Sequence, residues 1–118
     1  MSKILVIDDE PDIIKVLISR LQANGYEVVS ATNGEEGLER FQKENPDLIV
    51  LDILMPQMDG YTFVKRLKKA DGDIPIIVLT AKSGMKDLFA IEGITDYVVK
   101  PFNADELLKK IEKNLRKE

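Results

Sequence analysis

The chain alternates between short, continuous apolar runs and stretches in which apolar residues recur every three or four positions. Short runs rich in branched side chains are typical of strands buried on both faces, and the wider spacing predicts helices with one buried face. Strands are predicted at residues 3–8, 26–31, 47–52, 75–80 and 95–100. Helices are predicted after them at residues 11–24, 34–44, 61–70, 82–92 and 104–115. This strict alternation predicts an α/β fold, with helices on both faces of a doubly wound, five-stranded parallel sheet.

Local signals mark the ends of these elements. Pro11 suits the first turn of the first helix, and Gly25 ends that helix. Asn45 precedes a proline, which biases it away from the helical conformation and closes the second helix. Asn103 and Glu106 have the spacing of a capping box, with Asn in place of the usual Ser or Thr, so the last helix is predicted to begin there. Because the connections are short throughout, we expect residues 1–118 to form one domain.

The composition excludes several classes of site. The 118 residues include neither Cys nor His, so disulfides, thiolate chemistry and imidazole bases or ligands are ruled out. Any bound metal must therefore be a hard cation held by oxygen, such as Mg²⁺ or Ca²⁺. The formal net charge of −4 argues against a nucleic-acid surface on this domain. Since no apolar stretch is long enough to cross a membrane and the N-terminus has no signal-peptide pattern, we expect a cytoplasmic protein.

Polar side chains that can carry chemistry stand at the C-terminal ends of four of the five predicted strands. They are Asp8 and Asp9 at the end of the first strand, Asp52 at the end of the third, Thr80 at the end of the fourth and Lys100 at the end of the fifth. The carboxyl ends of the strands in such a sheet share one edge, so we expect these side chains to converge. Three carboxylates in one place repel one another unless a cation lies between them, and oxygen ligands favour Mg²⁺.

This set of groups suits the transfer of a phosphoryl group. The metal and Lys100 neutralise phosphoryl oxygens, the Thr80 hydroxyl donates to another, and the Asp52 carboxylate attacks to form an aspartyl phosphate. No proton has to leave an ionised Asp, so the lack of His is no obstacle. Taken singly, each residue also has a structural interpretation as a loop cap, a strand end or a solvated charge. Their occurrence at four strand ends favours the chemical interpretation.

Four motifs make the chain resemble the receiver domains of two-component response regulators. They are VIDDEPDI at 6–13, LDILMPQMDG at 51–60, LTA at 79–81 and DYVVKPF at 96–102, and the resemblance covers essentially the whole chain. It implies a flavodoxin-like strand order, 2-1-3-4-5, with Asp52 as the phosphoacceptor. It also implies that Asp9 binds Mg²⁺ directly, that Asp8 acts largely through water, and that the backbone carbonyl of Leu54 completes the metal site with Asp52.

The same resemblance implies a conformational switch. Thr80 reports phosphorylation, Lys100 contacts the phosphoryl group, and Tyr97 turns inward when the Thr80 hydroxyl moves toward the phosphate. The alternative is that Tyr97 is a half-exposed strand residue without a role in the switch. The resemblance also implies that the Lys100–Pro101 peptide bond is cis. The segment between Thr80 and Lys100 is shorter than is usual in the family, so we expect the fourth helix or the loop before it to be short or recast.

The resemblance implies a phosphorelay protein and not an enzyme that acts on other molecules, because its chemistry is limited to its own phosphorylation and autodephosphorylation. The implied partners are a sensor histidine kinase or phosphotransfer protein and a downstream effector protein or domain, without direct nucleic-acid or membrane contact. A phosphorylation-dependent dimer is left open.

The main alternative is a docking module that works independently of phosphorylation. Phosphatases of the haloacid-dehalogenase type need Asp-x-Asp after the first strand, where this chain has Asp8 and Asp9 side by side, and the Gly-rich nucleotide-binding motifs are missing.

Overall fold

The computed structural model describes residues 2–52, 60–69, 74–81 and 94–116, and in these ranges it contains five strands and four helices. The strands are β1 (Lys3–Ile7), β2 (Glu27–Ala31), β3 (Leu48–Asp52), β4 (Ile76–Ala81) and β5 (Asp96–Lys100). The helices are α1 (Pro11–Ala23), α2 (Gly34–Glu44), α3 (Gly60–Lys69) and α5 (Ala104–Leu115). The helix predicted at 82–92 lies outside the described residues. None of the described helices is long and apolar enough to cross a bilayer.

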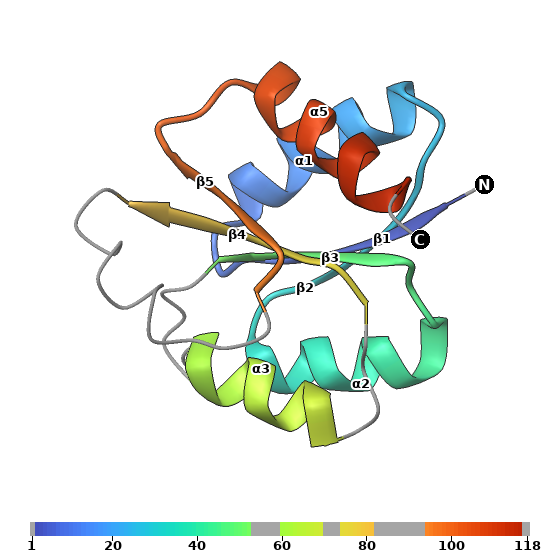
Figure 1. The fold of residues 1–118 in the computed structure, drawn as a ribbon, viewed down its shortest axis with the longest axis vertical. Coiled ribbons are helices and arrows are strands. Elements are labelled where there is room, and N and C mark those ends of the chain that lie inside the picture. The colour runs from blue at the N-terminus through green and yellow to red at the C-terminus, as the bar shows by residue number, and fades with distance from the viewer. Residues whose placement is uncertain (1, 53–59, 70–73, 82–93, 117–118) are drawn as a thin grey trace.

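The strands form one parallel sheet in the order β2-β1-β3-β4-β5, which confirms the predicted arrangement (Figure 1). In the register of the sheet, Asp52 of β3 lies beside Leu79 of β4, and Ala81 of β4 lies beside Lys100 of β5. Since all the strands are parallel, their carboxyl ends meet at one edge of the sheet. In Figure 1, β1, β3 and β4 run toward the left-hand side, where this edge lies.

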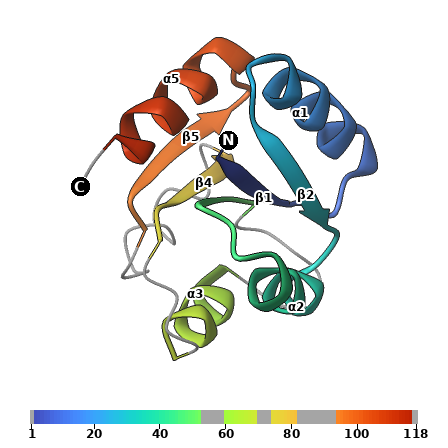
Figure 2. The ribbon, with the colours of Figure 1, turned by 90° about the vertical axis from the view of Figure 1, so that its right-hand side faces the viewer.

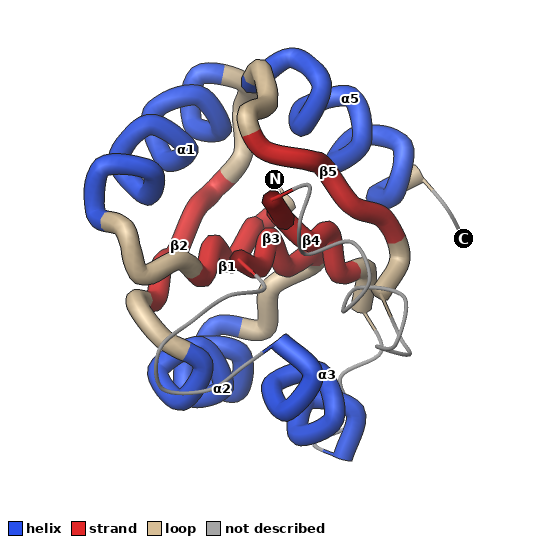
Figure 3. Tube along the Cα trace, turned by 90° about the vertical axis from the view of Figure 1, so that its left-hand side faces the viewer, coloured by secondary structure: helices blue, strands red, loops and turns tan. Residues whose placement is uncertain are grey.

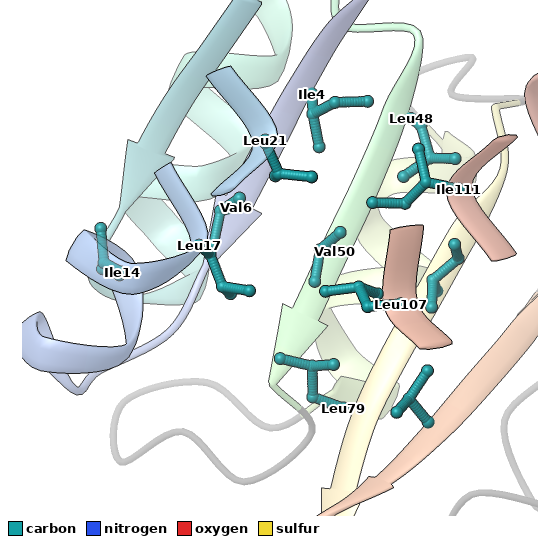
Figure 4. Close-up of a cluster of buried hydrophobic side chains, with 12 residues drawn as sticks. Ile4, Val6, Ile14, Leu17, Leu21, Leu48, Val50, Leu79, Leu107 and Ile111 are labelled. Carbon is teal, nitrogen blue, oxygen red and sulfur yellow. The ribbon is translucent and has the colours of Figure 1, made fainter. Parts of the chain in front are cut away.

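Helices cover both faces of the sheet, α1 and α5 on one face and α2 and α3 on the other (Figures 2 and 3). Successive residues of a strand point to opposite faces, so each central strand contributes to two cores. Leu5 of β1 packs with Phe63 in the core under α2 and α3. Val6 packs with Leu17 and Leu107 in the core under α1 and α5 (Figure 4). Burial on both faces explains why the central strands read as continuous apolar runs.

Residues at the helix ends, among them the predicted Gly25, Asn45 and Asn103, adopt conformations that start or stop a helix. Asn33 and Asn103 cap α2 and α5, because the side-chain oxygen of each accepts a hydrogen bond from the backbone N–H three residues further on. Asn45 follows α2 in the left-handed conformation, with φ of 49°. Gly25 follows α1 with φ of 89°, a conformation that favours glycine. Local sequence therefore fixes both ends of α2, the N-terminal end of α5 and the C-terminal end of α1.

Gly37 allows α2 to approach the sheet closely. A Cβ atom at this position would lie 2.6 Å from Cδ1 of Ile7 and 3.2 Å from Cε1 of Phe63. Ile7 is the last residue of β1, so this contact packs α2 against the strand end that carries the first acidic residues. Because Gly37 has no side chain, α2 can pack closely against the carboxyl end of β1 and so helps to set the position of the carboxyl edge.

Candidate functional site

Three of the predicted site residues lie at the carboxyl edge of the sheet and share one face. Asp8 directly follows β1, Asp52 ends β3 and Lys100 ends β5. In each of these strands, the residue two positions earlier packs in the core under α1 and α5. Because side chains alternate along a strand, all three polar side chains belong to that same face.

Asp8 is fully buried. Its Oδ1 accepts a hydrogen bond from the backbone N–H of Glu10 at 2.9 Å, and its own N–H donates to the carbonyl of Ala31 at 3.1 Å. Its Oδ2 is buried and has no hydrogen-bond partner among the described residues. Burial, together with a smaller contribution from the charge of Asp52, raises the pKa of Asp8 to about 6, although the hydrogen bond from Glu10 acts to lower it. A cation beside Oδ2 would satisfy this oxygen and stabilise its charge.

Asp9 and Glu10 are exposed and continue the acidic cluster toward solvent. One carboxylate oxygen from each of Asp8, Asp9 and Glu10 lies within 4.8 Å of the other two. Hard divalent cations take oxygen ligands of this kind. The donor set, with one buried and two exposed carboxylates, therefore fits a Mg²⁺ ion at the surface of the carboxyl edge.

Asp52 and Lys100 form an ion pair beside this cluster. The Nζ atom of Lys100 lies 3.7 Å from Oδ2 of Asp52, and only 7% of the Asp52 side chain is exposed. The pKa of Asp8 responds to both charges, since Asp52 raises it and Lys100 lowers it. The three side chains therefore form one electrostatic unit, in which a nearly buried carboxylate faces a fixed cation.

Thr80 lies at the same edge on the neighbouring strand. It is fully buried, and it follows Leu79, the residue that pairs with Asp52 across the two strands. On its other side, Thr80 pairs with Val99, the residue before Lys100. Its position in the register is thus one step beyond Asp52 and one step before Lys100.

Tyr97 lies near the other end of β5, half-buried against the core under α2 and α3. Lys110 of α5 donates to the backbone carbonyl of Tyr97 and places its Nζ 5.1 Å from the centre of the ring. Lys110 also pairs with Asp96 at 3.2 Å, and Asn114 donates to the same carboxylate at 3.3 Å. Burial acts to raise the pKa of Asp96, but the hydrogen bonds outweigh burial and hold this pKa below its usual value. This cluster joins α5 to β5 at the predicted switch residue.

Two further predictions concern Leu54 and Pro101. Leu54, which was predicted to complete the metal site, lies outside the described residues. The Lys100–Pro101 peptide bond is cis, as the resemblance implied. The sequence reasoning did not single out Glu10, although its position directly after two aspartates was an available signal.

An apolar groove adjoins the site between α1 and the chain that leads from β5 into α5. The residues that line it are Asp12, Ile13, Val16, Leu17, Phe102 and Ala104. Val16 is 59% exposed, and it is the one large hydrophobic side chain among the described residues with such exposure. The groove therefore offers apolar contact area next to the helix that begins at the acidic cluster.

The chain matches the family model for the response regulator receiver domain over residues 4–112. It is 49% identical over 117 residues to "Probable transcriptional regulator ycf27" of Porphyridium aerugineum, which covers 98% of this chain and 48% of that protein. It is 41% identical over 117 residues to the alkaline phosphatase synthesis transcriptional regulatory protein PhoP of Bacillus subtilis, which covers 98% of this chain and 49% of PhoP. The chain thus spans about half the length of the curated relatives that it matches.

Solved structures give the same result at the level of the fold. The receiver domain of NtrX from Brucella abortus superposes with a TM-score of 0.91 at 28% identity, over 98% of this chain and 99% of that one. A response regulator receiver domain protein from Clostridium thermocellum superposes with a TM-score of 0.90 at 31% identity, over 98% of this chain and 94% of that one.

Proposed function

We propose, from the premise that this chain belongs to the response regulator receiver domain family, that it accepts a phosphoryl group on Asp52 and thereby switches an output surface. The observation that carries this proposal is the geometry of the carboxyl edge. The Asp52 carboxylate lies 3.7 Å from the Lys100 ammonium, beside the buried Oδ2 of Asp8, which has no hydrogen-bond partner in the part of the chain that the structure describes. In this proposal, residues 1–118 act as one receiver unit.

The residues of the edge divide the work between binding and reaction. Asp8, Asp9, Asp52 and the backbone carbonyl of Leu54 would hold Mg²⁺. The closeness of the Asp8 and Asp9 carboxylates supports their part in this assignment. When bound, Mg²⁺ supplies positive charge to the phosphoryl oxygens during transfer. This assignment makes the reaction dependent on magnesium.

Asp52 is the nucleophile. One of its carboxylate oxygens forms the new bond to phosphorus as the bond from phosphorus to the donor breaks, and the donor keeps that electron pair. The Lys100 ammonium neutralises a phosphoryl oxygen, because it already lies next to the attacking carboxylate. The Thr80 hydroxyl donates to another phosphoryl oxygen from the end of β4. Hydrolysis of the resulting acyl phosphate returns the chain to its starting state.

The switch connects this edge to the surface that includes β5 and α5. Phosphorylation adds about −1.5 to −2 charges and strong acceptor oxygens, so it biases the position of a nearby hydroxyl such as that of Thr80. Tyr97 is the residue that responds, since it is half-buried on β5 and in contact with α5 through Lys110. Rotation of its ring would change the surface formed by β5 and α5.

The partners follow from this assignment. A sensor histidine kinase or phosphotransfer protein supplies the phosphoryl group, and a downstream effector protein or domain reads the switched surface, as a monomer or as a phosphorylation-dependent dimer. The donor must bring its phosphoryl group to the carboxyl edge, so it has to contact the surface beside that edge. The apolar groove at Val16 is a suitable contact, because it lies along the helix that starts at the acidic cluster.

The test is phosphorylation by a small donor. We expect acetyl phosphate with Mg²⁺ to add the mass of one phosphoryl group to the chain, and we expect no addition in EDTA or in Asp52→Asn. Beryllofluoride, which imitates the acyl phosphate, should change the tyrosine signals of the protein only with Mg²⁺. If neither reagent acts on the folded protein, a docking module that works independently of phosphorylation becomes the better interpretation.

A further inference from the structure

Glu10 occupies a position whose usual structural role it does not perform. It is the N-cap residue of α1, but its side chain makes no capping hydrogen bond. Asn33 and Asn103, the N-cap residues of α2 and α5, both make such a bond. N-cap positions favour Ser, Thr, Asp and Asn, whose short side chains reach the free N–H groups of the first turn. Helix capping therefore does not explain the carboxylate at Glu10.

The backbone of Glu10 is instead held from both sides. Its N–H donates to Oδ1 of Asp8 at 2.9 Å, and its carbonyl accepts from the N–H of Ile14 at 3.2 Å. Its side-chain oxygen lies within 4.8 Å of carboxylate oxygens of both Asp8 and Asp9. The backbone thus presents the Glu10 carboxylate to the same cluster that contains the buried Oδ2 of Asp8, for which the described ranges of the chain supply no hydrogen-bond partner.

The size of this cluster indicates how Glu10 would act. Oxygens that bind one Mg²⁺ ion directly, at about 2.1 Å, are separated by at most about 4.2 Å. The spacing of up to 4.8 Å is slightly larger than this, and it suits a group of carboxylates of which one contacts the ion through a bound water molecule. Glu10 lies on the exposed side of the cluster, where Mg²⁺ retains its waters.

We propose that Glu10 is a fourth acidic residue of the magnesium site, beside Asp8, Asp9 and Asp52, and that it is a positioning residue that accepts a hydrogen bond from a metal-bound water and thereby tightens magnesium binding. This inference rests on the proposed function, because it concerns the same ion. It adds to the aspartates a residue whose loss weakens the ion's affinity without removing the nucleophile or a direct ligand.

The experiment measures Mg²⁺ binding to the full chain by isothermal titration calorimetry. Loss of a group that orients metal-bound water lowers metal affinity by about tenfold or more, so we expect about a tenfold weaker Mg²⁺ affinity for Glu10→Gln. The matched control is Asp12→Asn, which removes the same charge from the first turn of α1 at a residue outside the cluster. We expect Asp12→Asn to bind Mg²⁺ within about twofold of the wild type, because an exposed charge outside the cluster is largely screened.

A second variant separates metal binding from helix stability. Glu10→Ser introduces a favourable N-cap side chain, so in EDTA it should melt at the same temperature as the wild type or higher. In Mg²⁺, it should bind the ion about as weakly as Glu10→Gln. If Glu10 acted only through folding, the melting temperature in EDTA and the Mg²⁺ affinity would change in the same direction.

The possible results distinguish this inference from the proposed function. If Glu10→Gln and Glu10→Ser bind Mg²⁺ as tightly as Asp12→Asn, the role of Glu10 is refuted, while labelling of the wild type by acetyl phosphate still supports the proposed function. If the wild type itself binds no Mg²⁺ and accepts no phosphoryl group, the proposed function fails and the role of Glu10 fails with it.

Discussion

Replacing Asp8 with Asn should stabilise the metal-free protein at neutral pH. The substitution keeps the size of the side chain and the oxygen that accepts from Glu10, but it removes the charge. In the native protein, burial raises the pKa of Asp8 from 3.8 to about 6. A shift of about two units corresponds to roughly 3 kcal/mol, at about 1.36 kcal/mol per unit. The ionised, buried carboxylate therefore lowers the free energy of unfolding by up to about that amount.

The sign of the effect gives it a characteristic pH dependence. The native pKa of Asp8 lies above the unfolded value, so the unfolded state releases its proton first as the pH rises. The penalty is small below about pH 4, grows between about pH 4 and 6, and is complete above about pH 6. In the variant, the new amide N–H donors offset part of the gain, because buried donors without partners are unfavourable by about 1–3 kcal/mol. We therefore expect a net gain of about 1–2 kcal/mol at about pH 7.5.

The assay is urea unfolding followed by circular dichroism in EDTA, at about pH 4.5, 6 and 7.5. Asp9→Asn is the matched control, since Asp9 is exposed and a surface substitution usually changes stability by no more than about 0.5 kcal/mol. With Mg²⁺ present, the order of stability should reverse, because the ion stabilises only a protein that can bind it. A variant no more stable than the wild type in EDTA near pH 7.5, or a gain that does not vary with pH, would refute the reasoning.

The other predictions concern packing, the β5–α5 cluster and the groove. Gly37→Ala should lower the free energy of unfolding by about 1–3 kcal/mol, because the new methyl group meets Ile7; an unchanged urea midpoint would mean that Ile7 moves aside without strain. Asp96→Asn should destabilise the protein at neutral pH, and the loss should shrink as the pH falls through the lowered pKa of Asp96, since only the ionised carboxylate gains from Lys110. Unfolding measured at several pH values checks this, and a loss that is constant with pH contradicts it. Val16→Glu should slow phosphorylation by a phosphohistidine-containing donor protein and leave labelling by acetyl phosphate unchanged, because it places a charge in the apolar groove away from the reacting atoms. Equal slowing with both donors would instead indicate damage to the site itself.

The fold could be predicted from sequence because its signals are local and repeated. Residues 48–51 form an apolar run that only a strand buried on both faces explains, and the structure buries them completely. Asn103 and Gly25 act through their own backbone neighbourhood, so their roles can be read without knowing the fold. The positions of Asp8, Asp52 and Lys100 at one edge followed from the parallel sheet alone.

Other features depend on three-dimensional contacts that no local pattern records. Glu10 directly follows two aspartates in the sequence, but that order alone does not show that the three carboxylates approach one another. Lys110 reads as a solvated charge on the last helix, but it contacts a ring and a carboxylate of β5. Gly37 reads as a destabilising residue inside a helix, but the Ile7 side chain lies so close that a side chain at this position would clash with it. The roles of Lys110 and Gly37 are set by neighbours that are distant in the sequence.

The alternation of β1 and β3 between two cores links the length of these strands to the chemistry at their ends. Inserting or deleting one residue inside either strand would exchange its two sets of buried side chains, and it would also turn Asp8 or Asp52 toward the opposite side of the sheet. A frame shift of this kind would thus abolish hydrophobic packing and catalytic alignment in a single event. Length differences between this chain and its homologues should accordingly fall in the connections, while the strands keep a constant number of residues.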